Sequence, residues 1–222
     1  MMSVASAGNS PNAIDPAFIQ LARSWVKDPA RQFLTFIWLA YEDLLAAKPV
    51  IDGRDLERGI TQLLEPRVRD VMTGDEPFYV QHSPFERETM KAPPAQPPEY
   101  DLAFVLRADE RIMWPLEAKV LERPGSVNAY VRDLTDEYLT CRYAPFSHSG
   151  AMLGYLLTGK PEDALEAIAG KLGVTLEEVI NLPTATNRCS EHRRTVPTEK
   201  PYPPEFRCYH LILEFPFVQR SH

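Results

Sequence analysis

The chain has 222 residues, of which 44% are hydrophobic and 25% charged, the composition of an ordinary globular protein with its own core. A formal net charge of −7 argues against a protein that coats nucleic acid by bulk positive charge, but not against an enzyme with an acidic metal site. The longest apolar runs are too short to cross a membrane, and neither a secretory signal nor a complete disulfide framework is recognisable. These features predict a cytoplasmic protein without a membrane partner.

The N-terminal part is expected to be a tail followed by two helices. Residues 1–14 predict a disordered tail, and apolar residues at helical spacing predict a helix over 15–47. A second amphipathic helix is predicted over 54–72, where Pro66 is expected to kink or divide it.

The middle of the chain predicts strands, a proline-rich loop and one further helix. Alternating or continuous apolar residues indicate the strands, and the short gap at 108–110 is typical of a hairpin turn. In chain order we expect a strand over 78–82, a loop over 90–98, strands over 100–107 and 111–121, a helix over 127–141 and a strand over 151–157.

The C-terminal part predicts a helix over 161–172, a helical turn over 176–181, a polar loop over 183–204 and a strand over 208–215. Mixed order of this kind favours one α/β domain over 15–222 with a mixed central sheet flanked by helices. Its expected parts are a helical segment over 15–50, a core over 54–160, and a C-terminal helix, loop and strand over 161–222.

Acidic and basic residues mark the two central predicted strands. Asp101 directly precedes the apolar run of the first strand, and Glu117 and Lys119 lie two positions apart in the second. Since strand side chains alternate between faces, Glu117 and Lys119 point the same way, and pairing of the strands brings Asp101 beside them. Two carboxylates suit a hard divalent cation such as Mg²⁺ or Mn²⁺, and a nearby ammonium can stabilise developing negative charge.

This pattern resembles the PD-(D/E)xK nuclease superfamily, whose members share the restriction-endonuclease-like fold. That family carries a first acid on one strand and Asp/Glu-x-Lys on the next, within a core of a helix, three strands, a helix and a further strand. The elements predicted from residue 54 to residue 157 follow that order, so the resemblance covers about half of the chain. One departure is that Tyr100, not proline, precedes Asp101.

The resemblance implies roles for individual residues. Asp101, Glu117 and the carbonyl of Ala118 would hold the metal ion, and Lys119 would assist the attacking water or the transition state. An acid of the preceding helix often joins such sites, and Glu57 is the preferred residue, with Glu65 and Glu42 as rivals. Glu99 is an alternative first acid, since it shares a strand face with Asp101.

Two groups of residues are candidate nucleic-acid contacts. Arg132, Tyr138 and Arg142 belong to the helix that follows the motif, which in related nucleases often supplies a polar contact. Arg188, Arg193 and Arg194, together with His192, form the best basic cluster of the chain and lie in the predicted polar loop.

Three other motifs do not support a function. The pairs Cys189/His192 and Cys208/His210 fit zinc spacing poorly, and His210 in an apolar strand is expected to be a satisfied core histidine. The run 154–161 departs from a phosphate-binding loop because Pro161 replaces its Ser or Thr. Ser147 lacks the surroundings of a serine hydrolase.

The sequence therefore predicts a Mg²⁺- or Mn²⁺-dependent nuclease that cleaves phosphodiester bonds, preferably of DNA, in prokaryotic defence or DNA processing. The first alternative is an inactive nuclease-like module that binds a protein partner or structured nucleic acid. A weaker third alternative is an α/β interaction protein with no such site. A homo-oligomer is compatible with each of them.

Overall fold

The computed structural model describes residues 29–51, 53–87, 97–180, 182 and 187–218. The expected tail over 1–14 and the expected helical residues 15–28 lie outside this part of the chain. Within the described ranges, none of the helices has both the length and the apolar character needed to cross a membrane.

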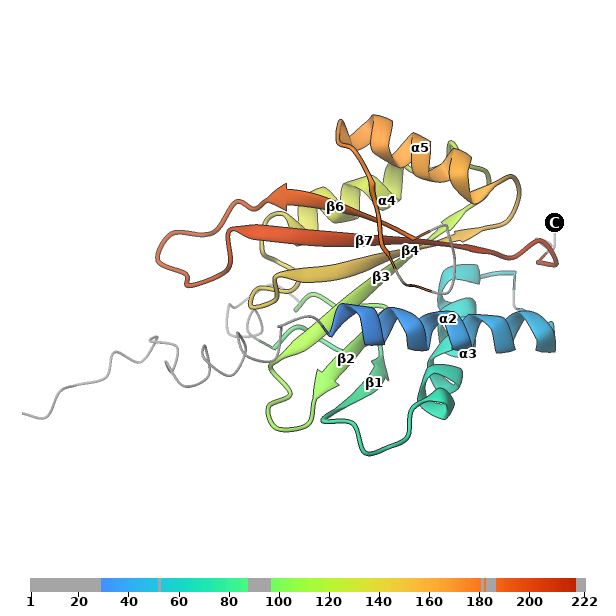
Figure 1. Ribbon diagram of the computed structural model, residues 1–222, viewed down its shortest axis with the longest axis horizontal. Helices are drawn as coiled ribbons and strands as arrows, with labels where there is room; N and C mark the ends of the chain where they lie inside the picture. Colours follow the sequence, from blue (N-terminus) through green and yellow to red (C-terminus); the bar gives the residue numbers. More distant parts are fainter. Residues whose placement is uncertain (1–28, 52, 88–96, 181, 183–186, 219–222) are drawn as a thin grey trace, which may run out of the picture.

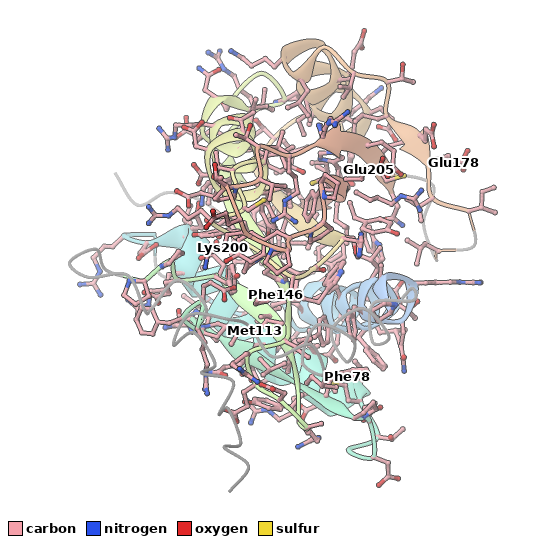
Figure 2. All side chains as sticks on the ribbon, turned by 90° about the vertical axis from the view of Figure 1, so that its left-hand side faces the viewer. Phe78, Met113, Phe146, Glu178, Lys200 and Glu205 are labelled. Atoms are coloured by element: carbon pink, nitrogen blue, oxygen red, sulfur yellow. The ribbon has the colours of Figure 1, made fainter. Side chains whose placement is uncertain are left out.

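A seven-stranded mixed sheet is the centre of the described structure, which confirms the predicted α/β class with helices around a mixed sheet (Figure 1). The three neighbouring strands β3, β4 and β7 are parallel, and all other neighbours are antiparallel. In spatial order the strands are β1 (Phe78–His82), β2 (Leu102–Leu106), β3 (Met113–Leu121), β4 (Ser149–Leu156), β7 (Glu205–Glu214), β6 (Arg188–Arg193) and β5 (Glu177–Glu178). Figure 2 shows Phe78 of β1 and Glu178 of β5 at opposite ends of the sheet.

Helices cover both faces of this sheet. On one face, α2 (Ala30–Ala47) and α3 (Leu56–Val71) pack over a core that includes the inward side chains of the strands. On the other face lie α4 (Asn128–Asp133), the π-helical turn η2 (Leu134–Tyr138) and α5 (Pro161–Leu172), as Figure 1 shows. The two cores explain the alternation along β3, where Ala118 faces the first core and Glu117 and Lys119 face away from it.

The helix ends follow local sequence chemistry. The side chain of Asp55 accepts a hydrogen bond from the backbone N–H of Arg58 at 3.2 Å and so caps the start of α3. Helix α5 begins at Pro161 and ends at Leu172, and the capping residue Gly173 has a φ of 66°, the left-handed conformation that glycine adopts without strain. The predicted bounds of α5 are thereby confirmed.

An aromatic cluster joins α2 to the edge half of the sheet. Phe33 of α2 stacks on Phe104 of β2 with ring centroids 4.1 Å apart, and Phe78 of β1 meets Phe33 edge-on at 4.6 Å. Trp114 of β3 is fully buried beside them, and its indole N–H donates to the hydroxyl of Ser149 at 2.9 Å. This cluster fixes β2 and β3, the strands that carry the acidic motif, relative to the helices.

Two predictions in the C-terminal part are wrong. The expected helical turn over 176–181 contains the short strand β5, and the expected loop over 183–204 contains the six-residue strand β6. Strand β6 consists largely of polar residues, and it forms because its backbone pairs with β7 along its whole length. Pairing of this kind depends on residues distant in sequence, so side-chain alternation does not reveal it.

Two helix predictions need smaller corrections. The single helix expected over 127–141 is an α-helix that widens into a π-helical turn from Leu134 to Tyr138. Helix α3 runs through Pro66 without being divided. A π-helical turn within a helix is often found beside a functional site, and this one directly follows Asp133.

Gly150 allows η2 to approach the sheet closely. A Cβ at this position in β4 would lie 2.8 Å from the Tyr138 ring and 3.2 Å from both the Phe206 ring and the backbone oxygen of Pro115. We expect Gly150→Ala to lower the free energy of unfolding by about 1–3 kcal/mol through overpacking. In Gly170→Ala, the added Cβ in α5 meets no atom within 4 Å. Because alanine favours the helix more than glycine does, this variant should raise the free energy of unfolding by up to about 1 kcal/mol. Urea unfolding of both variants measures these changes. Equal changes in the free energy of unfolding would contradict the prediction.

Candidate functional site

The acid–acid-x-lysine motif forms one cluster at the end of the sheet where β2 begins. The antiparallel register pairs Leu102 with Leu116, so Asp101, one residue before β2, lies beside Glu117 of β3. The Oδ2 atom of Asp101 accepts a hydrogen bond from the backbone N–H of Ala118 at 2.7 Å. The hairpin between the two strands therefore brings both predicted acids together.

Lys119 lies at the centre of four carboxylates. Its Nζ is 2.8 Å from Glu117 Oε1 and 3.0 Å from Glu57 Oε1. It is also 3.2 Å from Asp133 Oδ2 and 4.0 Å from Asp101 Oδ2. We call these five residues the acidic cluster. Three elements and one loop residue build it: α3, β3, α4 and Asp101 at the start of β2.

The backbone also contributes to the cluster. The carbonyl oxygen of Ala118 accepts a hydrogen bond from Lys119 Nζ at 2.6 Å, so this oxygen points towards the same centre as the carboxylates. The second carboxylate oxygen of Glu57 accepts from the N–H of Val120 at 3.3 Å, which fixes α3 to the end of β3. The first turn of α3 is therefore held at the acidic cluster by two contacts of one side chain.

Burial dominates the electrostatics of the carboxyl groups. Desolvation raises the pKa of Glu117 well above its usual value, and repulsion from Asp101 adds to this, while the ammonium of Lys119 opposes it. Desolvation likewise raises the pKa of Asp101 and of Glu57, again opposed by Lys119. One ammonium does not fully compensate the crowded acids, so the cluster favours additional positive charge.

Lys119 remains protonated at neutral pH. Burial lowers the pKa of its ammonium group, but the charges of Glu117, Asp101 and Glu57 outweigh burial and raise that pKa above its usual value. The side chain is only 13% exposed, so it has little freedom to leave the carboxylates. Lys119 is therefore a hydrogen-bond donor with a fixed positive charge.

The donor set fits a divalent metal ion. The Oε2 atom of Glu117 is buried and has no hydrogen-bond partner among the described residues, an arrangement that costs free energy unless a proton, a cation or a water satisfies it. The nearby oxygens of Asp101 and Ala118 are hard ligands of the kind that Mg²⁺ and Mn²⁺ prefer. In the described part of the chain, no three His, Cys, Asp or Glu side chains are already grouped around a common point as metal ligands. The carboxylates surround Lys119 Nζ instead.

The structure also separates the alternatives left open by the sequence. Asp101 and not Glu99 lies at the cluster, since Glu99 is exposed and forms an isolated bridge with Phe85. Glu57 and not its rivals contacts Lys119, because Glu65 pairs with Arg69 one helical turn later. Glu42 is an exposed residue of α2.

Asp133 is the member of the cluster that the sequence did not predict. It is the last residue of α4 and follows the buried Tyr130 by three positions, so it lies at the border of the apolar face that packs on the sheet. An acidic residue at the edge of an apolar helix face can be recognised in the sequence as a candidate site residue. The spacing of the apolar residues does not, however, predict which strand the helix packs on. Its neighbour Arg132, a predicted nucleic-acid contact, is largely exposed, and the Nε of Arg132 lies 3.3 Å from Oδ1 of Asp133.

The other predicted contacts in this helix have partners outside the acidic cluster. Arg142 pairs with Glu137 at 2.7 Å on the surface. Tyr138 is fully buried, and its hydroxyl donates to the backbone oxygens of Pro115 and Ala151 at 3.3 and 3.1 Å. Tyr138 therefore anchors η2 to the sheet, while nucleic-acid contacts by Arg132 and Arg142 remain predictions.

The C-terminal basic residues do not join the acidic cluster. Arg188 and Arg193 lie on β6, which β4 and β7 separate from β3, so their nucleic-acid contacts remain a prediction without a link to the cluster. Arg194 is buried, and its guanidinium donates to the backbone oxygens of Ser147, Tyr143 and Ala144 at 2.8–3.1 Å. Arg194 follows β6 in the loop, but it is buried and joins β6 to the turn before β4, so its predicted nucleic-acid contact is not supported by an exposed guanidinium.

His210 is a satisfied core histidine, as predicted. It is fully buried, with Nδ1 2.9 Å from the Tyr130 hydroxyl and Nε2 2.7 Å from the Ser190 hydroxyl. Ser190 in turn lies 2.6 Å from Nε2 of His192, which completes a hydrogen-bonded chain across β7 and β6. Both imidazole nitrogens of His210 are thus used inside the core.

Comparison of the chain with protein-family models, curated proteins and solved structures found no match.

Proposed function

We propose that this protein is a metal-dependent nuclease whose active site is the acidic cluster. The observation that carries the proposal is the convergence of Glu57 from α3, Asp101 from the residue before β2, and Glu117 and Lys119 from β3 on one point. The order α3, β1, β2, β3, α4 and β4 also agrees with the order of elements in the restriction-endonuclease-like core. The preferred substrate is DNA, with genome defence or DNA processing in the cytoplasm of a prokaryote as the setting.

The residues divide into metal ligands and a charge donor. Asp101, Glu117 and the carbonyl of Ala118 would hold Mg²⁺ or Mn²⁺, and Glu117 Oε2 is the oxygen with no other partner. A bound ion supplies Lewis-acid activation of the phosphate and of the attacking water. A bound metal ion would compete with Lys119 for the carboxylate of Glu117. We therefore expect the ammonium of Lys119 to shift towards the substrate when the ion is present.

Lys119 acts as a donor of hydrogen bonds and not as a base. Since the neighbouring carboxylates keep it protonated, it cannot accept a proton from water at neutral pH. Its ammonium instead donates to a phosphate oxygen and stabilises the negative charge that develops there. Glu57 and Asp133 hold the ammonium in place from either side of β3.

One observation favours the rival function, a nuclease-like module that binds a protein partner without cleaving. In the described residues the acids are grouped around an ammonium and not as a ready-made metal centre, and Lys119 already offsets part of their charge. Such a module would use the cluster for stability alone. Metal binding distinguishes the two functions.

The test is cleavage of supercoiled plasmid, linear duplex, single-stranded DNA and RNA with Mg²⁺ or Mn²⁺, together with a Mn²⁺ titration. We expect metal-dependent cleavage by the wild type and a loss of at least about a hundredfold in Glu117→Gln, with much weaker Mn²⁺ binding. Glu205→Gln, the same change at an exposed position of β7, is the matched control and should behave as the wild type (Figure 2). Absence of both cleavage and Mn²⁺ binding in the wild type would refute the proposal.

A further inference from the structure

A groove outside the acidic cluster runs along the open edge of β1, beside α3. Its volume is about 520 Å³, and its lining combines arginine, aromatic and amide side chains. We propose that this groove binds a single strand of nucleic acid and leads it to the acidic cluster. This inference rests on the proposed nuclease function and names its substrate class. The residues that carry it are Arg69, Tyr79, Gln81, His82 and Arg107.

The charge of the groove differs from that of the whole chain. Arg69 and Arg107 line it together with one carboxylate, Glu65, whereas the chain as a whole carries a net charge of −7. Arg69 is 64% exposed while it contacts Glu65, so its guanidinium still faces solvent and has further N–H donors. A local excess of guanidinium groups on an acidic protein is what phosphate recognition requires.

Arg107 and Tyr79 form a cationic and aromatic platform on the face of β1 that is turned away from α3. The guanidinium carbon of Arg107 lies 5.5 Å from the centroid of the Tyr79 ring, and its Nε donates to the backbone oxygen of Glu76 at 3.0 Å. The Tyr79 hydroxyl donates to Glu110 at 3.0 Å, which holds the ring in place. Aromatic rings beside arginines bind unpaired bases by stacking, and this binding tolerates any base.

The groove leads to the acidic cluster along β1. His82, at the C-terminal end of β1 and in the lining of the groove, pairs with Leu102, the residue after Asp101. The next residue, Ser83, donates its N–H to the backbone oxygen of Asp101 at 3.1 Å. Arg107 directly follows β2 and marks the opposite end of the groove, so the distance along β1 is about 15 Å.

The size of the groove favours a single strand. Its volume lies within the range of sites for small ligands, which suffices for a few nucleotides and not for a duplex. Strand β1 also has an open edge, since it pairs only with β2 among the described strands. An extended peptide that adds to this edge is the competing occupant, and the experiment includes it.

The experiment measures fluorescence anisotropy of labelled single-stranded DNA, single-stranded RNA and duplex DNA in EDTA, which prevents cleavage. We expect the double variant Arg69→Ala/Arg107→Ala to raise the Kd for single strands by about tenfold or more. The slope of log K against log salt should fall by about 1.4, because each lost phosphate contact contributes about 0.7 on single strands. Tyr79→Ala should weaken binding several-fold, and Tyr79→Phe should retain it.

Arg207→Ala is the matched control, because Arg207 is also an exposed arginine paired with a glutamate, here Glu191, but lies on β7. It should bind as the wild type. The inference is overturned if the wild type binds no single strand, if the double variant equals the wild type, if Arg207→Ala weakens binding equally, or if an unlabelled extended peptide binds at the groove in preference to the oligonucleotide.

The two proposals fail separately. Unchanged oligonucleotide binding by the double variant, together with Mn²⁺-dependent cleavage, overturns the groove and leaves the nuclease. Groove-dependent binding without Mn²⁺ binding or cleavage overturns the nuclease and supports the groove as a nucleic-acid site.

Discussion

Lys119→Ala is expected to abolish metal-dependent cleavage and to destabilise the fold at neutral pH. The variant removes the ammonium that lies among Glu57, Asp101, Glu117 and Asp133, so these carboxylates repel one another in a partly dry site. Breaking a buried ion pair costs about 3–5 kcal/mol, and the partial exposure of Glu57 and Asp101 reduces the expected loss to about 2–4 kcal/mol. Urea unfolding and the cleavage assay measure the two effects.

The pH dependence of this loss has a definite sign. Burial already raises the pKa of Glu117 and of Asp101, and removal of the ammonium raises them further. A carboxyl group with a higher pKa in the folded state binds its proton more tightly there, so the deficit of the variant should shrink as the pH falls from about 7 to about 5. Mn²⁺ should also restore stability to Lys119→Ala.

Lys171→Ala, at an exposed position of α5, is the control for the loss of one lysine charge and should have wild-type stability and activity. A Lys119→Ala protein with wild-type stability at neutral pH would show that the four carboxylates do not depend on the ammonium. Retained cleavage in that variant would indicate another active site or a contaminating nuclease.

Mild acid should destabilise this protein through His210. Burial lowers the pKa of His210 from 6.5 to about 3, and the neighbouring His192 contributes in the same direction. Between these two pH values the unfolded chain binds a proton that the folded protein excludes, so stability is complete above about pH 6.5 and falls with decreasing pH. The linkage predicts a loss of about 3 kcal/mol at about pH 4.

The measurement is urea unfolding at neutral pH and near pH 4 for the wild type and for His210→Gln. The variant should be less stable at neutral pH, because the contacts with Tyr130 and Ser190 are impaired, but its stability should change less with pH. His148→Gln, at an exposed position, should keep the pH dependence of the wild type. An equal pH dependence in His210→Gln would assign the acid sensitivity to other groups.

The central part of the fold and most of the acidic cluster could be predicted from the sequence because local rules determine them. A short turn fixes the register of β2 and β3, and this register alone places Asp101 beside Glu117. The period of two in β3 places Glu117 and Lys119 on one side, and Pro161 marks the start of α5.

The remaining features depend on contacts between distant segments. Strand β6 has a polar sequence and exists through its pairing with β7, while Asp133 reaches Lys119 only because α4 packs across β3. The burial of Arg194 could not be predicted for the same reason. Arginine is rarely buried, and here its burial depends on three backbone oxygens from the segment before β4. The groove beside β1 likewise arises from the packing of α3 on an edge strand.

The position of β7 has a consequence for biosynthesis. This strand, the last one of the described chain, lies between β4 and β6, so the interior of the sheet is completed by residues that leave the ribosome after all the other described strands. Until then β4, which is buried along its entire length in the finished protein, presents an unpaired edge that other chains can pair with. Premature termination before residue 205 would therefore yield an aggregation-prone product, although every residue of the acidic cluster would already have been synthesised.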